Sequence, residues 1–256
     1  MNDPKVQALY YRVGHDDTID YAKAPPVEHF EPNFRIRIAD GKAEVEPIVT
    51  YRSIDEARAA VEPFLRMWEV KATLERGPGE LTFAYQCAEV IDRNPTDARA
   101  VLAGIGSVGV GVTAVLHVSR GQYPPPPSGM KCDSLVQRMF SKYLMYQMDS
   151  TTLPDAANYC LTALEKPYEK SGKSKRKAAA HHNSIEKKVL DKLGQLAASK
   201  GELDARKFHD PPSPFTRAER HWLESLLRLL IRRAAERASN ATASLPLITM
   251  NDLPIL

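Results

Sequence analysis

Three side chains in the second half of the sequence could carry out acid–base chemistry on a phosphodiester. Arg176 is followed five positions later by His181, and His182 comes directly after it. A histidine with a pKa near neutrality can take the proton of a ribose hydroxyl or protonate a leaving oxygen, and a guanidinium offsets charge that develops on the phosphate. These residue types therefore suit proton transfer and charge stabilisation at a phosphodiester such as RNA, with Arg176 and His181 as the candidate catalytic residues, and they require no cofactor.

The spacing of this pair permits catalysis without requiring it. Five residues of a regular helix turn through about 500°, which leaves the two side chains roughly 140° apart. Arg176 would therefore have to stand at the start of a helix or reach around it. The neighbouring segment is strongly basic and could gather RNA, so we expect it to contact the nucleic acid. Its contact residues would be Lys173, Lys175 and Lys177.

The Arg-x4-His pattern resembles the motif of HEPN domains, in a helical context that covers at most residues 132–238. HEPN domains are small helical bundles in which paired subunits cut RNA without a metal. The resemblance implies a four-helix bundle, a homodimer and catalytic roles for Arg176 and His181; the polar residue that usually follows the HEPN arginine is Lys177 here. A strand-rich half before such a helical half also resembles ApeA-type anti-phage proteins, which implies a role in bacterial defence.

The same stretch admits a second interpretation as a DNA-binding helix-turn-helix. Residues 175–180 would form its first helix, residues 182–184 its turn and residues 186–196 its second helix. Lys187 and Lys188 would then face a DNA groove or its phosphates. The residues that would pack the two helices together are Ala179, Ile185, Val189 and Leu190. RNA is the favoured partner, DNA is the alternative, and a protein-interaction subunit without nucleic-acid contact is a third possibility.

Two further patterns are better explained without a ligand. The glycines between residues 104 and 109 match GxGxxG, but a dinucleotide loop needs a strand before it and a helix after it, and here that order is reversed. Residues 15–20 contain one histidine and three aspartates, which are ligands for a divalent cation. Adjacent residues of an extended chain point in opposite directions, however, so a solvated turn is expected there and no metal site.

Composition favours a cytoplasmic protein that does not contact a membrane. The chain has 256 residues, of which 43% are hydrophobic, and no stretch approaches the roughly 20 apolar residues that a membrane span requires. Its three cysteines are widely spaced, which excludes a CxxC knuckle and a disulfide framework. A net charge of +3 argues against a protein whose whole surface binds nucleic acid. The basic residues cluster in the second half, where any polyanion would bind.

Alternating apolar residues predict a largely antiparallel first half. Residues 34–38 and 43–47 alternate on either side of Asp40-Gly41, which is typical of a β-hairpin. Ser53 and Glu56 have the spacing of a capping box before an amphipathic helix, which Pro63 would kink or end. Further strands are expected at residues 70–74 and 81–87, which would pair across a Gly-Pro-Gly turn, and at residues 108–118.

A run of four prolines at residues 124–127 favours polyproline II and cannot continue a helix or a sheet. We therefore expect a sheet domain at residues 1–123, a linker at 124–131, a helical domain at 132–239 and an extended tail at 240–256. Helical periodicity predicts helices at residues 135–144, 154–164, 175–182, 185–198 and after a capping box at Thr216, with a basic loop near residue 171. The expected fold class is α+β, with a strand-rich antiparallel half and a covering helix before an all-helical bundle.

Overall fold

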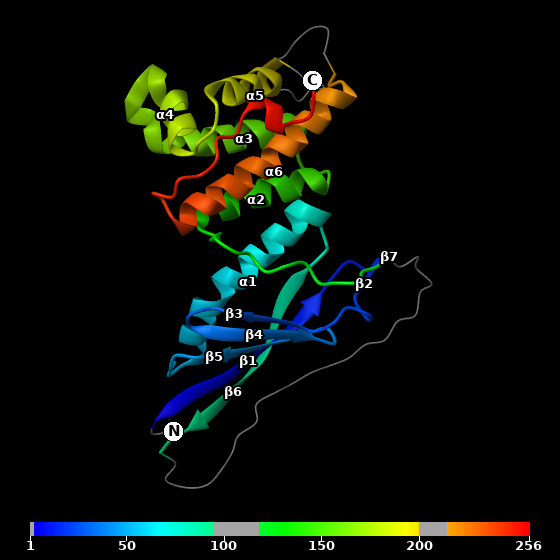
Figure 1. The fold of residues 1–256 in the computed structure, drawn as a ribbon, viewed down its shortest axis with the longest axis vertical. Coiled ribbons are helices and arrows are strands. Elements are labelled where there is room, and N and C mark those ends of the chain that lie inside the picture. Colours follow the sequence, from blue (N-terminus) through cyan, green and yellow to red (C-terminus); the bar gives the residue numbers. More distant parts are fainter. Residues whose placement is uncertain (1–2, 95–117, 200–213) are drawn as a thin grey trace. The chain divides into compact units, whose positions relative to one another are not determined.

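The computed structural model describes residues 3–94, 118–199 and 214–256 of the chain. Contacts divide the chain into two units, Met1–Ser128 and Gly129–Leu256, called here the sheet unit and the helical unit. Figure 1 shows the strands and helix α1 in the first unit and helices α2 to α6 in the second. With 48% helix and 21% strand, the structure confirms the predicted α+β class.

An antiparallel sheet of five strands, in the order β3-β4-β5-β1-β6, forms the main part of the sheet unit. The strands are β1 (Pro4–Gly14), β3 (Val27–Phe30), β4 (Phe34–Ala39), β5 (Lys42–Pro47) and β6 (Thr82–Asp92), and a parallel pair joins β2 (Ile19–Asp20) to β7 (Val118–Ser119). The predicted hairpin is β4–β5, and its turn residues Asp40 and Gly41 have φ values of 50° and 70°. Two successive positive φ values match the twist of the strands, which explains the Asp-Gly pair.

Helix α1 (Ile54–Arg76) begins at the predicted cap and packs its apolar side into one core with the sheet. The hydroxyl of Ser53 accepts a hydrogen bond from the amide of Glu56 at 3.2 Å. The carboxylate of Glu56 in turn accepts one from the amide of Arg52 at 3.1 Å. Two amides at the helix start are thereby bonded, which stabilises this end of α1.

The strand predicted at residues 70–74 is wrong, because α1 continues through them to Arg76. The buried face of α1 has apolar residues at steps of three and four, namely Val61, Leu65, Trp68 and Ala72. This helical period continues past residue 70, so these residues form a helix although a few of them also alternate as in a strand. The helix also continues through Pro63, which lies on its exposed side. Of the two expectations at this proline, a kink or a helix boundary, the boundary is therefore wrong.

The described part of the helical unit contains five α-helices and two 3-10 helices. They are α2 (Ser134–Gln147), α3 (Leu153–Glu165), η1 (Lys166–Ser174), α4 (Lys175–His182), α5 (Lys187–Ser199), α6 (Arg217–Ser239) and η2 (Met250–Asp252). The loop predicted near residue 171 is η1 instead, and α5 begins two residues later than predicted. The capping box of α6 is confirmed, with Thr216 and Glu219 each bonding the other's amide. None of the helices in the described ranges is both long and apolar enough to cross a membrane.

Two sequence predictions fall outside the described residues. The strand expected at residues 108–118 lies outside them except for Val118, which belongs to β7. The glycines between residues 104 and 109 also lie outside them. The dinucleotide pattern and its alternative, a glycine loop, both stay predictions.

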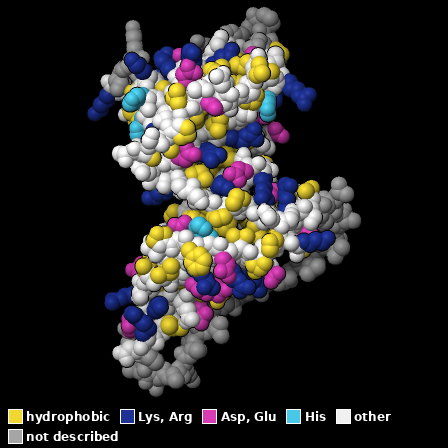
Figure 2. Space-filling view, viewed as in Figure 1, with side chains coloured by type: hydrophobic (Ala, Val, Ile, Leu, Met, Phe, Trp, Pro, Cys, Tyr) yellow, Lys and Arg dark blue, Asp and Glu magenta, His cyan; other side chains and the backbone are white. Residues whose placement is uncertain are grey.

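Charge is divided unevenly between the two units. Residues 1–128 contain 14 Lys and Arg against 18 Asp and Glu, a net charge of −4, whereas residues 129–256 contain 21 against 14, a net charge of +7. On the face of the sheet unit that Figure 2 shows, acidic and basic side chains lie intermingled. An anionic partner would therefore be attracted more strongly to the helical unit.

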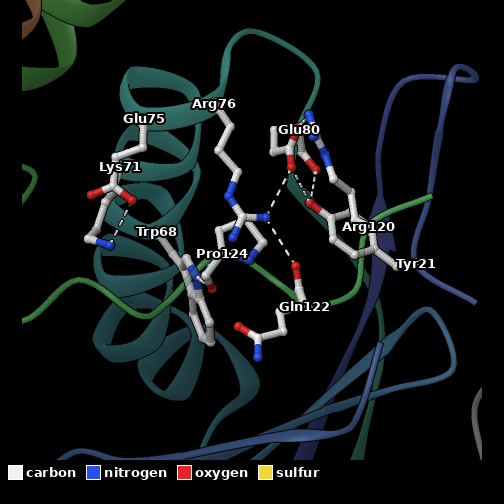
Figure 3. Close-up of polar contacts among 9 residues, drawn as sticks. All are labelled: Tyr21, Trp68, Lys71, Glu75, Arg76, Glu80, Arg120, Gln122 and Pro124. Carbon is white, nitrogen blue, oxygen red and sulfur yellow. Dashed lines mark hydrogen bonds and ion pairs between the residues drawn. The ribbon is translucent and has the colours of Figure 1, made fainter. Parts of the chain in front are cut away.

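A buried carboxylate holds the segment after β7 against the end of α1. Glu80 is 1% exposed, and Figure 3 shows it receiving hydrogen bonds from Tyr21, Arg76 and Arg120, at 2.6, 3.2 and 3.0 Å. Burial alone raises the pKa of Glu80, but the bonds from these three side chains outweigh it and lower the pKa below its ordinary value. The carboxylate is therefore charged in the folded protein at neutral pH.

The proline run is anchored to the same helix. Trp68 donates its indole N–H to the carbonyl of Pro124 at 2.8 Å, and Lys71 donates to the carbonyl of Pro125 at 3.1 Å. Figure 3 shows Trp68 beside this segment. Prolines 124 and 125 thus pack on the sheet unit.

The substitution Glu80→Gln should lower the free energy of unfolding by about 2 kcal/mol in urea titrations at pH 7, because two arginines lose a shared, buried carboxylate. The deficit should shrink as the pH falls through the folded pKa of Glu80, which lies below its ordinary value, because the wild-type carboxylate is then protonated too. Glu75→Gln removes the surface partner of Lys71 and should cost less than about 0.5 kcal/mol. Equal losses for the two variants would contradict the role given to Glu80.

Candidate functional site

Helix α4 carries both residues that the sequence proposes for catalysis, on different sides. Ala179 and Ala180 are buried, so their side of α4 faces the interior of the helical unit. Each residue advances by 100° around a helix, which places Arg176 on this inner side. Lys177 and His181 are four residues apart, share the opposite side and are both exposed.

Arg176 is held by two carboxylates. Its Nε donates to Oε1 of Glu165 at 2.6 Å, and its Nη1 donates to Oδ1 of Asp191 at 3.4 Å. The guanidinium also lies against the backbone of α5 at Gly194, where an added Cβ would come within 3.1 Å of Nη1. Any residue larger than glycine at this position would therefore press on the arginine.

Glu165 explains why Arg176 turns inward. It ends α3 and is 4% exposed, and its second oxygen lies 3.2 Å from Nζ of Lys175. A carboxylate removed from water must be paired with a cation, and Arg176 is its closer partner. The side chain of His181 makes no hydrogen bond or ion pair within the described part of the chain. In a single chain, the two proposed catalytic residues are thus not brought together.

Four of the five lysines proposed to contact nucleic acid lie on the consecutive helices α4 and α5. We call Lys175, Lys177, Lys187, Lys188 and His181 the basic cluster. The side chain of Lys188 is 77% exposed and lies 2.9 Å from Glu186, and that of Lys187 lies 2.6 Å from Asp191. Lys177 forms no ion pair with a described residue. Lys173 belongs to η1, and its side chain lies outside what the structure describes.

The two helices of the basic cluster meet at a tight corner. All four residues predicted to pack a helix-turn-helix, namely Ala179, Ile185, Val189 and Leu190, are buried. Ser184 in the turn has a φ of 49°, and Asn183 donates its side-chain amide to the carbonyl of Ala179 at 2.9 Å. Figure 2 shows cyan histidine side chains beside dark blue ones at the α4 end of the helical unit.

Two arginines of α6 donate hydrogen bonds to other segments of the helical unit. Arg233 is 5% exposed and donates to the carbonyls of Asn183 and Pro246, at 2.9 and 2.8 Å. Arg237 donates to the hydroxyl of Ser184 at 2.8 Å and to the carbonyl of Ala243 at 2.6 Å. They fasten both the α4–α5 turn and the tail, so they contribute positive charge without being free to bind a polyanion.

A cavity of about 320 Å³ lies beside the same turn. Its lining includes His182, Tyr168, Arg237 and Asp133, and the rings of His182 and Tyr168 are 5.9 Å apart. Burial, Arg237 and His181 all lower the pKa of His182, so its imidazole is neutral at pH 7 and can accept a proton. Sequence alone does not indicate this cavity, because His182 and Asn183 are joined there by residues from distant segments.

The aspartates near the start of the chain stabilise turns. Asp16 accepts hydrogen bonds from the amide and the hydroxyl of Thr18, at 2.9 and 2.8 Å. Asp20 accepts one from the amide of Ala22 at 2.8 Å. Within the ranges that the structure describes, no group of three or more His, Cys, Asp or Glu side chains is placed to hold a metal ion.

Comparison with known proteins assigns no family to the chain. No protein-family model matches it, and neither a curated protein nor a solved structure matches it. The HEPN resemblance therefore depends on the Arg-x4-His motif and its helical context alone, and it stays a prediction.

The substitution Arg176→Ala should lower the free energy of unfolding by about 2 kcal/mol, because Glu165 stays buried with Lys175 as its remaining partner. Urea unfolding would measure the loss. Lys177→Ala, one residue away and exposed, should change stability by less than about 0.5 kcal/mol. Adding Glu165→Gln to Arg176→Ala should recover part of the loss, since the buried charge that has lost its closer partner is then removed. An Arg176→Ala variant as stable as wild type would show that this arginine is not held by Glu165.

Proposed function

We propose that the helical unit binds nucleic acid through the basic cluster on α4 and α5. The observation that carries the proposal is the net charge of +7 in residues 129–256, with exposed lysines on both helices of a tight corner. Nucleic-acid affinity is dominated by phosphate neutralisation, which needs exposed cations. Lys177 is such a cation. Of the three lysines in the cluster that form ion pairs, Lys188 has the most exposed side chain.

The ion pairs of the other lysines do not prevent phosphate binding. The side chains of Lys187 and Asp191 are 53% and 44% exposed. Ion pairs between solvated side chains contribute at most about 1 kcal/mol, so a phosphate can replace the carboxylate at little cost. Asp191 is moreover shared between Lys187 and Arg176, so one carboxylate faces two cations and the positive charge is in excess.

The corner itself favours duplex DNA as the first ligand to test. In a helix-turn-helix, the first residues of the second helix enter the major groove. Lys187 and Lys188 are the first two residues of α5 and are both exposed. The packing of α4 and α5 and the position of these lysines support this mode, in which the remaining lysines would contact phosphates.

Replacing Lys187 and Lys188 by alanine should weaken duplex binding about tenfold or more and reduce its salt dependence. Each lost phosphate contact should make the slope of log affinity against log salt less negative by about 0.9. Fluorescence anisotropy of a labelled duplex at several salt concentrations would measure both quantities.

The control variant carries Lys23→Ala and Lys42→Ala, two exposed lysines of the sheet unit. It has the same change in net charge and should bind as the wild type does. Equal weakening by both double variants would mean that the total charge matters and not the basic cluster.

RNA cleavage is the second candidate, and the position of His181 and His182 favours it. His181 lies on the exposed side of α4 with Lys177, and His182 is a neutral imidazole next to it. One could accept the proton of a ribose hydroxyl while the lysine stabilises the phosphate. Arg176 would join them only if it left Glu165 or came from a second copy in the homodimer that the HEPN resemblance implies. Both candidates imply a cytoplasmic location, where nucleic acid is accessible.

If the chain cleaves RNA, His181→Ala should abolish the activity while leaving stability within about 0.5 kcal/mol, because the side chain is exposed. Gel analysis of a single-stranded RNA in the presence of a chelator would measure cleavage. His221→Ala removes another exposed histidine, at the start of α6, and should keep full activity. Cleavage that persists in the His181→Ala variant would exclude this histidine as a catalytic residue.

A further inference from the structure

A second cavity, of about 350 Å³, lies in the sheet unit between α1 and strands β1 and β6. We call it the α1 pocket. Helix α1 supplies Arg58, Glu62 and Glu69, and the strands supply Tyr11 and Tyr85. Its volume is in the range of pockets that hold small molecules. Nothing in the proposed function of the helical unit uses this pocket.

The hydroxyl of Tyr11 marks the pocket as a place where a polar ligand would gain a bond. Tyr11 is 2% exposed, and the guanidinium of Arg58 lies beside its Oη, but no contact there reaches hydrogen-bond geometry among the described residues. Its neighbour Tyr10 lies on the other face of β1 and bonds Glu44 and Glu89, both at 3.5 Å. Buried hydroxyls are nearly always bonded, because an unbonded one costs about 1–3 kcal/mol. Burial raises the pKa of Tyr11, so the hydroxyl is protonated and can donate.

The charges around this hydroxyl are already paired. Nε of Arg58 donates to Glu62 at 2.7 Å, and Nη1 of Arg66 donates to Glu69 at 2.7 Å. Two guanidiniums and two carboxylates leave no net charge in the α1 pocket. A phosphate or carboxylate alone would therefore gain little from entering, and an apolar ligand would leave these groups without water.

Flat surfaces complete the pocket. The guanidinium carbon of Arg58 lies 4.4 Å from the ring centre of Tyr85, and the rings of Tyr11 and Tyr85 meet edge to face at 5.7 Å. Flat rings stack on aromatic side chains and on guanidiniums. The side chain of Glu62 is 40% exposed, so it can move aside and admit a ligand to the Tyr11 hydroxyl while Arg58 stays on the ring of Tyr85.

We propose that the α1 pocket binds the base of a free nucleoside or nucleotide, stacked on the Arg58–Tyr85 layer. A nucleobase is neutral and planar and presents hydrogen-bond donors and acceptors on one edge. The Tyr11 hydroxyl donates to a ring nitrogen or carbonyl of the base, and Glu62 accepts from an amino or imino group. The sheet unit thereby recognises a small molecule independently of any polynucleotide bound by the helical unit.

Isothermal titration of the full chain with AMP, GMP, CMP and UMP tests the proposal. At least one nucleotide should bind, and Tyr11→Phe should weaken that binding about tenfold by removing one hydrogen bond. The unfolding free energy of Tyr11→Phe should change little, because the lost hydroxyl forms no well-aligned hydrogen bond in the protein. Glu62→Gln should also weaken binding and, being at the surface, should fold normally.

Tyr10→Phe is the matched control, since it removes a hydroxyl from the opposite face of the same strand; it should bind the nucleotide as the wild type does. The Lys187→Ala and Lys188→Ala variant should also bind it normally, which separates this site from the basic cluster. The proposal is overturned if none of the four nucleotides binds, if Tyr11→Phe and Tyr10→Phe bind equally, or if ribose 5-phosphate binds as tightly as the nucleotide.

Discussion

Glu165 ends helix α3 inside the helical unit, and its carboxylate must be neutralised there because burial removes it from water. The cations that do so, Arg176 and Lys175, are the first two residues of α4. This pairing fixes the rotation of α4 about its own axis. Once Arg176 turns inward, helical geometry places Lys177 and His181 outward. The surface that we propose for nucleic acid therefore follows from one buried acid in the preceding helix.

The same principle holds irregular segments elsewhere in the chain. In the sheet unit, Glu80 gathers Arg76 and Arg120 at the end of α1. In the helical unit, Arg233 and Arg237 bond backbone carbonyls of the α4–α5 turn and the tail. A guanidinium has five donors in a rigid fork, so a single arginine can satisfy several carbonyls that no helix or strand would bond. Several of the basic residues in the sequence thus bond groups inside the protein.

Much of the fold could be predicted from local sequence. The Asp-Gly turn, the Ser53 and Thr216 caps and the helical periodicities after residue 132 all indicate the elements that the structure contains. The error at residues 70–74 arose where a short alternating stretch lies within a longer helical one. Over a few residues both patterns fit the sequence, and packing of the whole α1 face against the sheet decides between them.

The candidate site was less predictable, because burial and pairing depend on residues far apart in the chain. The sequence shows an arginine and a histidine five positions apart, but it does not show that Glu165 is buried beside the arginine. Nor does local pattern indicate the α1 pocket, whose wall joins Tyr11 to residues of α1 and β6. The exposure of the lysines was easier to predict, because a lysine on the polar side of a helix is normally exposed whatever its neighbours are.

The segment around Ile248 closes the α4–α5 turn, although it lies far along the sequence from that turn. Ile248 pairs with Ile185 as a short parallel bridge, with its amide bonded to the carbonyl of Ser184 and its carbonyl to the amide of Glu186. During synthesis, these backbone groups of the turn have no such partners until Ile248 has left the ribosome. Contacts of this sequence separation form late and slow folding. Helices α4 and α5 would therefore reach their final arrangement only after Ile248 has been synthesised.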